Sequence, residues 1–127
     1  MAIVSCRRIQ VNSDSGIDKY KQGILQDSLT KLDSLILKYR VINPSVCYKY
    51  AKEANEIAKK INTHEAFARA NMMFGNVYFT SKMDSSFYYD QQALLIIDSF
   101  QIKKEKGNVL YNLGMLYNVQ NPVILTT

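Results

Sequence analysis

The sequence contains one short motif twice, 39 residues apart. The motif is FGNVY at residues 74–78 and LGMLY at residues 113–117. The same offset aligns three further pairs of identical residues: Tyr50 with Tyr89, Ala54 with Ala93, and Ile57 with Ile96. One offset shared by separate motifs indicates an internal repeat, which is typical of an array of similar stacked units.

Length and composition describe a chain of one ordinary domain. The 127 residues are 47% hydrophobic and 21% charged, which is a typical globular composition. Five glycines and two prolines provide little of the turn chemistry that a β-sandwich needs. No apolar run approaches the ~18 residues that span a bilayer.

The net charge of +5 comes from the first half of the chain. Residues 1–63 hold eleven Lys and Arg against six Asp and Glu, whereas residues 64–127 hold five of each. Several of the surplus lysines are interleaved with Glu53 and Glu56 along one expected helix. We therefore interpret them as a solvated helix face and do not expect nucleic acid as a partner.

Periodic apolar residues, together with cap residues, predict five helices. They are expected from Ile17 to Tyr39, from Asn43 and Pro44 to Ile61, from a Thr63 cap with residues 66–80 as the body, from an Asp84 or Ser85 cap to about Ile102, and from about Lys104 to Asn118. The connections are only about two to five residues long, so neighbouring helices are expected to be antiparallel.

The repeated motif resembles the Leu-Gly-x-x-Tyr core of the tetratricopeptide repeat family. The resemblance covers residues 28–122 and implies an all-α fold of antiparallel helical hairpins, stacked as a short right-handed solenoid of about two and a half repeats. Gly75 and Gly114 would lie where a neighbouring helix comes close, since glycine inside a helix otherwise costs about 1 kcal/mol. Small residues on the partner helices would receive these contacts: Cys47, Ala54, Ser86 and Ala93.

The sequence departs from the family pattern in several respects. The period is 39 residues rather than about 34. Leu32, Asn71 and Leu110 replace the aromatic residue that precedes Leu-Gly in the family, and Ile36 replaces the glycine of the first repeat. Longer helices with Tyr-Tyr-Asp before an Ala-Leu pair resemble the tetratricopeptide regions of bacterial sensor kinases and response regulators.

The resemblance also implies a groove in which the first helix of each pair holds a short peptide. The groove residues expected from it are Arg69, Met72, Asn76 and Phe79 in the second repeat, and Asn108, Tyr111, Met115 and Asn118 in the third. Asn76 matches the asparagine with which some family members hold a peptide's terminal carboxylate. Met72 stands where those members have a lysine, so the match to a carboxylate clamp is incomplete.

The beginning of the sequence fits two interpretations. Residues 1–16 are a disordered leader, or the truncated remnant of a lipoprotein-type signal. Residues 3–6 (IVSC) fit a lipoprotein cleavage pattern, with Cys6 as the lipidated residue, but the basic and apolar regions of a signal peptide do not precede them. The protein is then cytoplasmic or, with a lipid on Cys6, periplasmic or membrane-anchored.

The end of the sequence also looks cut. Residues 17–122 form the expected repeat domain, and Asn121-Pro122 lies where the second helix of the third repeat should begin, but only a truncated tail (residues 123–127) follows. The last helix would then lack a cover over three apolar residues: Leu113, Leu116 and Tyr117. We expect self-association through this uncapped helix.

No catalytic or metal-binding pattern is present. The chain has one histidine, His64, and two cysteines, Cys6 and Cys47, which do not make a zinc site or a histidine-activated nucleophile. The sequence leaves undecided whether Cys6 and Cys47 form a disulfide. We interpret His64, at the start of an expected helix, as a solvated loop residue, and we expect no enzymatic activity, metal or cofactor.

The expected function is a non-enzymatic protein–protein interaction module that binds a protein or peptide within a longer signalling or scaffold protein. The alternative is a ligand- or peptide-sensing region of a bacterial two-component or transcriptional regulator whose output domain is absent from this sequence. The sequence identifies neither the ligand nor the partner.

Overall fold

The structure, a computed structural model, describes residues 16–120. Within them it contains five helices and no strand: α1 (Gly16–Tyr39), α2 (Pro44–Ile61), α3 (His64–Tyr78), α4 (Met83–Ser99) and α5 (Lys106–Gln120). The predicted all-α class is therefore confirmed. The expected leader before Gly16, the lipidation site Cys6 and the expected tail lie outside the described residues.

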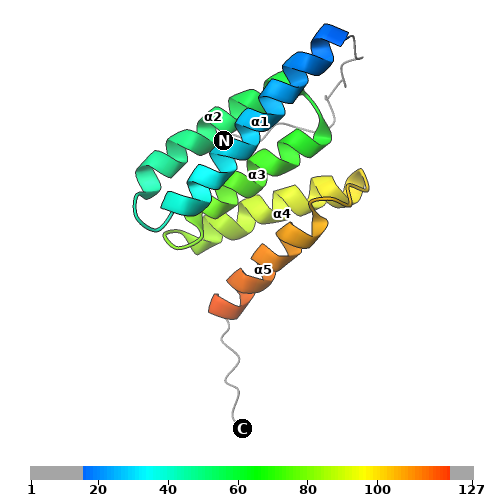
Figure 1. The fold of residues 1–127 in the computed structure, drawn as a ribbon. Helices are drawn as coiled ribbons and strands as arrows, with labels where there is room; N and C mark the ends of the chain where they lie inside the picture. The colour runs from blue at the N-terminus through cyan, green and yellow to red at the C-terminus, as the bar shows by residue number, and fades with distance from the viewer. Residues whose placement is uncertain (1–15, 121–127) are drawn as a thin grey trace.

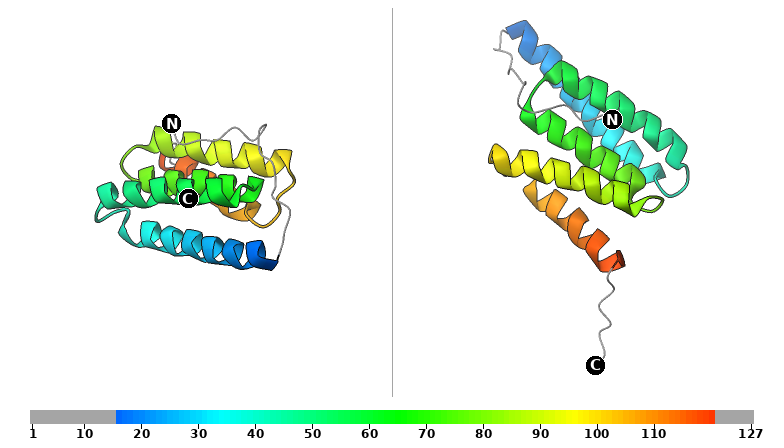
Figure 2. Two further views of the ribbon diagram at one scale, coloured as in Figure 1. Left: turned by 90° about the horizontal axis from the view of Figure 1, so that it is seen from above. Right: turned by 180° about the vertical axis from the view of Figure 1, so that it is seen from behind.

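Consecutive helices pack side by side and run in alternating directions (Figure 1). Each helix contacts its neighbour in the sequence, and α1 also contacts α3. In the further views, α1 and α4 lie on opposite sides of α3 (Figure 2). The third helix is therefore the centre of the packing, and its side chains from Ala66 to Val77 are nearly all buried.

Two of the predicted helix starts have the expected capping chemistry. The Asn43 side chain accepts a hydrogen bond from the Val46 amide at 3.3 Å, with Pro44 as the first residue of α2. The Thr63 hydroxyl accepts one from the Ala66 amide at 3.1 Å at the start of α3. Each bond satisfies an amide that has no partner within the helix.

The predicted boundaries of α4 are wrong. The helix begins at Met83, with Lys82 in the cap position and no side-chain cap bond, so neither Asp84 nor Ser85 is the cap. It ends at Ser99 rather than near Ile102. Gln101 has a φ of 53°, and this left-handed conformation interrupts the helix.

The predicted small residues of the second helices, Cys47, Ala54, Ser86 and Ala93, are all fully buried. The charged residues of α2 lie on the opposite face and are exposed: Lys49, Lys52, Glu53, Lys59 and Lys60. Lys59 makes an exposed ion pair with Glu56 at 2.9 Å. This face matches the predicted solvated surface.

The two motif glycines lie in different surroundings. The Ser86 hydroxyl donates a 2.6 Å hydrogen bond to the Gly75 carbonyl, and a Cβ on Gly75 would lie 2.9 Å from the carboxyl carbon of Asp90. The predicted close approach at Gly75 is therefore confirmed. A Cβ on Gly114 would meet nothing within 4 Å, so the same prediction is wrong for Gly114.

The predicted uncovered side of α5 is only partly correct. Leu116 is fully buried and Leu113 packs against the core, whereas Tyr117 is 58% exposed. The helix directs Val109 and Leu116 toward the core, and the exposed large apolar residues of α5 are instead Leu110, Tyr111, Met115, Tyr117 and Val119.

Substituting the two glycines with alanine should change stability in opposite directions. Gly114→Ala should raise the free energy of unfolding by about 0.5–1 kcal/mol, because alanine is the better helix former and the position has room. Gly75→Ala should lower it by about 1 kcal/mol or more, because the added methyl group displaces the buried Asp90 carboxyl. Urea unfolding of both variants measures the difference; a stabilised Gly75→Ala variant would contradict the close approach.

The backbone amides of α5 should exchange with solvent faster than those of α3. α5 packs mainly on α4, whereas α3 contacts α1, α2 and α4, and a helix with fewer buried contacts opens locally at lower free energy. Hydrogen exchange followed by NMR measures this, at a concentration where sedimentation shows a monomer, since self-association would cover α5. Equal protection of the two helices would show that α5 opens only with the whole domain.

Candidate functional site

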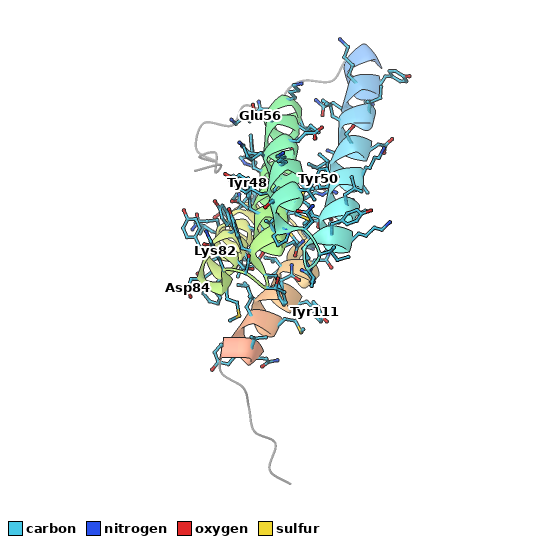
Figure 3. The ribbon with its side chains drawn as sticks, turned by 90° about the vertical axis from the view of Figure 1, so that its left-hand side faces the viewer. Tyr48, Tyr50, Glu56, Lys82, Asp84 and Tyr111 are labelled. Carbon is cyan, nitrogen blue, oxygen red and sulfur yellow. The ribbon has the colours of Figure 1, made fainter. Side chains whose placement is uncertain are left out.

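A cavity of about 280 Å³ lies between α1, α3 and α5, and we call it the α1–α3–α5 cavity. It is lined by Asp33, Leu37, Arg40, Arg69, Met72, Asn76, Glu105, Asn108, Tyr111 and Asn112. None of these residues comes from α2 or α4. In Figure 3, Tyr111 lies on the side of the molecule where α1 lies, and Lys82 and Asp84 lie on the other side.

Most of the groove residues expected from the family resemblance meet at this cavity. Those that line it are Arg69, Met72, Asn76, Asn108 and Tyr111. Phe79 lies next to it, because the Arg40 guanidinium stacks over its ring at 4.7 Å. Met115 and Asn118 are exposed on α5 and do not line the cavity.

Five residues that line the cavity were not predicted from the sequence: Asp33, Leu37, Arg40, Glu105 and Asn112. The repeat offset was a usable signal for the first three. Applied backward from Met72, Asn76 and Phe79, an offset of 39 residues leads to Asp33, Leu37 and Arg40. Glu105 and Asn112 are not repeat equivalents of any expected groove residue, so only the structure reveals them.

Side-chain hydrogen bonds hold the two arginines of the cavity. Arg69 donates to the Gln26 amide oxygen at 3.2 Å and to the Thr30 hydroxyl at 3.1 Å. Arg40 donates to the Asn76 amide oxygen at 3.4 Å. The Asn112 amide donates to the same Asn76 oxygen, also at 3.4 Å, so Asn76 links the end of α1 to α5 across the cavity.

The carboxyl group of Asp33 is in an unfavourable environment for its charge. Burial raises its pKa above the ordinary value of 3.8, and the negative charge of Glu105 raises it further. The positive charge of Arg69 and a hydrogen bond from Asn76 oppose this shift but do not cancel it. Asp33 and Glu105 both line the cavity, and their like charges repel each other.

The cavity holds two arginines and two carboxylates, yet none of them forms an ion pair there. The ion pairs within residues 16–120 are Lys59–Glu56 and Lys106–Asp98, and both are exposed. Glu105 is only 8% exposed and is in neither ion pair, and its carboxylate oxygens are not among the fully buried, unpartnered atoms of the described residues. Polar groups with unused bonding capacity therefore line the cavity.

A further buried carboxyl group, Asp90, lies on α4 against Gly75. It is 1% exposed, and neither of its oxygens has a hydrogen-bond partner among the described residues. Burial raises the pKa of Asp90 to about 7, although the positive charge of Arg40 lowers it in part. Asp90 therefore titrates near neutral pH, directly behind the Arg40 end of the cavity.

Asp90 should make the fold less stable as the pH rises from about 4 to about 7. Its folded-state pKa of about 7 lies above its ordinary value of 3.8, so the neutral carboxyl stabilises the folded state at low pH and this contribution is lost on deprotonation. The free energy of unfolding of Asp90→Asn, minus that of the unsubstituted chain, should rise by about 2–4 kcal/mol between pH 4 and pH 8. Urea unfolding across pH measures this; a difference that does not change with pH would contradict the assignment.

The prediction that His64 is a solvated loop residue is wrong. It is the first residue of α3, and its ring stacks on Phe100 with 3.5 Å between the ring centroids. Its Nδ1 is buried without a hydrogen-bond partner within the described residues, and burial lowers its pKa. The ring therefore ties the start of α3 to the end of α4 in its neutral form.

Cys47 is a free thiol buried against α1. Its Sγ lies 3.6 Å from the Ile36 carbonyl oxygen, and burial raises its pKa. Within residues 16–120 no group of three or more His, Cys, Asp or Glu side chains is arranged for a metal ion, and no helix there is both long and apolar enough to cross a membrane.

No protein-family model matches the chain, and neither a characterised protein nor a solved structure shows significant similarity to it. The tetratricopeptide resemblance therefore stays a prediction based on the repeated motif. The α1–α3–α5 cavity is therefore the feature from which a function can be inferred.

Proposed function

We propose that the chain is a non-enzymatic, tetratricopeptide-like module that binds a peptide segment of a partner protein through the α1–α3–α5 cavity. One observation carries the proposal: the lining comes only from α1, α3, α5 and the residues that adjoin them. These are the first helices of the three predicted repeats. In a stacked array of hairpins, the first helices share one face, which is the face that repeat proteins use for ligands.

The size of the cavity favours one inserted group over a whole ligand. Cavities for drug-sized molecules span about 300–1,000 Å³, and this one has about 280 Å³. We propose that one side chain or one chain end of the peptide enters it. The remainder of the peptide would then extend along the exposed side of α5, over Met115 and Asn118.

The chemistry of the lining supports binding rather than catalysis. The cavity presents amides, carboxylates, guanidinium groups and one phenol, and its described residues include no nucleophile beside a base. Asn76 is already engaged by Arg40 and Asn112. We therefore do not propose that Asn76 binds the terminal carboxylate of a peptide.

Two exposed tyrosines of α5 provide a matched test. Tyr111 lines the cavity and is 67% exposed, whereas Tyr117 lies outside it and is 58% exposed. Peptides selected on the full chain from a displayed random library should lose about fivefold or more in affinity with Tyr111→Ala, because an aromatic contact in a binding site typically contributes about 1 kcal/mol or more. Tyr117→Ala should leave the affinity within about twofold.

Isothermal titration calorimetry with the selected peptides measures both effects. Equal losses in the two variants would place binding on the exposed side of α5 and not in the cavity. Failure to select any peptide that binds the full chain would contradict the proposed function.

A further inference from the structure

We propose that the α1–α3–α5 cavity is a subsite for a primary ammonium group, held between the carboxylates of Asp33 and Glu105. The inference rests on the proposed peptide-binding function and adds the chemistry of the group that enters the cavity. That group is the side chain of a lysine or the N-terminal amine of the bound peptide.

The two carboxylates belong to different elements that meet at the cavity. Asp33 lies on α1, and Glu105 lies in the connection just before α5. Burial raises the pKa of Asp33, and the negative charge of Glu105 adds to this shift, although the charge of Arg69 opposes it more strongly. A cation between two such carboxylates removes their repulsion and compensates for their lost hydration.

Glu105 is a carboxylate of the cavity that the described residues do not pair with a cation. Its side chain lines the cavity and is mostly buried, within residues 16–120 it takes part in no ion pair, and its oxygens are not among the fully buried, unpartnered atoms. The adjacent Lys106 pairs with Asp98 at 3.0 Å instead. A buried carboxylate is costly unless it is paired, and an ammonium ion supplies three donors.

The two arginines of the cavity do not take the place of this cation. Arg69 directs its donors to Gln26 and Thr30, and Arg40 donates to Asn76 and stacks on Phe79. The charge of Arg69 favours the ionised form of Asp33, but among the described residues neither arginine forms an ion pair with Asp33 or Glu105. The carboxylates therefore face a space into which a ligand can bring the missing positive charge.

The other lining residues suit the stem of an alkyl amine. Leu37, Met72 and Tyr111 line the same cavity. Apolar walls favour the methylene chain of a lysine, which packs its stem while its charged head reaches polar partners. A tyrosine ring also attracts an ammonium ion through its face.

An array of short random-sequence peptides, probed with the full chain, tests the inference. Each sequence is present in four forms, with the lysine side chain free or acetylated and the N-terminal amine free or acetylated. Acetylation keeps the stem but removes the positive charge. We expect acetylation at one of the two positions to weaken binding about tenfold or more, the scale of one charge-assisted hydrogen bond, and the affected position identifies the source of the amine.

Glu105→Gln keeps the shape of the side chain and removes its charge. It should weaken binding of the amine-bearing peptides about tenfold and have little effect on the acetylated forms, and Asp33→Asn should act in the same direction. Glu53→Gln, an exposed change on α2, is the matched control and should leave the binding of every peptide form unchanged. Unfolding curves confirm that each variant is folded.

Two results would overturn the ammonium subsite and leave the proposed function intact. One is peptide binding that needs Tyr111 but does not depend on a free amine or on Glu105. The other is tighter binding by Glu105→Gln, which is expected if an anionic group of the peptide contacts Arg40 and Arg69. If no peptide of any form binds, the proposed function and the subsite are both wrong.

Discussion

The close approach of α3 and α4 at Gly75 is the contact on which the rest of the structure depends. Without a side chain at Gly75, the Ser86 hydroxyl reaches the Gly75 carbonyl and the Asp90 carboxyl fills the remaining space. The next residue, Asn76, faces the α1–α3–α5 cavity and binds Arg40, whose charge in turn acts on Asp90. One turn of α3 therefore joins the core contact to the wall of the cavity, and changes in either are expected to affect the other.

Local chemistry explains which parts of the fold were predictable. The starts of α2 and α3 have cap residues whose side chains bond to the helix, so Asn43 and Thr63 could be identified from sequence alone. The start of α4 has no such bond, and its position depends on packing against α3. Its end depends on the left-handed backbone of Gln101, a residue type with no strong preference for that conformation.

The repeated motif explains why part of the candidate site could be predicted from the sequence. Arg69, Asn76 and Tyr111, which the repeated motif predicted, line the cavity, whereas Met115, the repeat equivalent of Asn76, does not. Gly114 and Met115 differ from their repeat equivalents Gly75 and Asn76 because the surroundings of α5 differ from those of α3, which helices cover on most sides. A repeat predicts which residues are equivalent, but burial depends on the neighbours that each copy has.

The ion pairs of the described residues lie outside the α1–α3–α5 cavity. The pairs within the described residues lie at exposed positions, where each contributes about 0–1 kcal/mol. Asp33 and Glu105 are in neither pair and instead line the α1–α3–α5 cavity, where their like charges repel each other. Two carboxylates that share a cavity and form no ion pair within the described residues leave their attraction for a cation available to a ligand, and the proposed ammonium subsite uses this attraction.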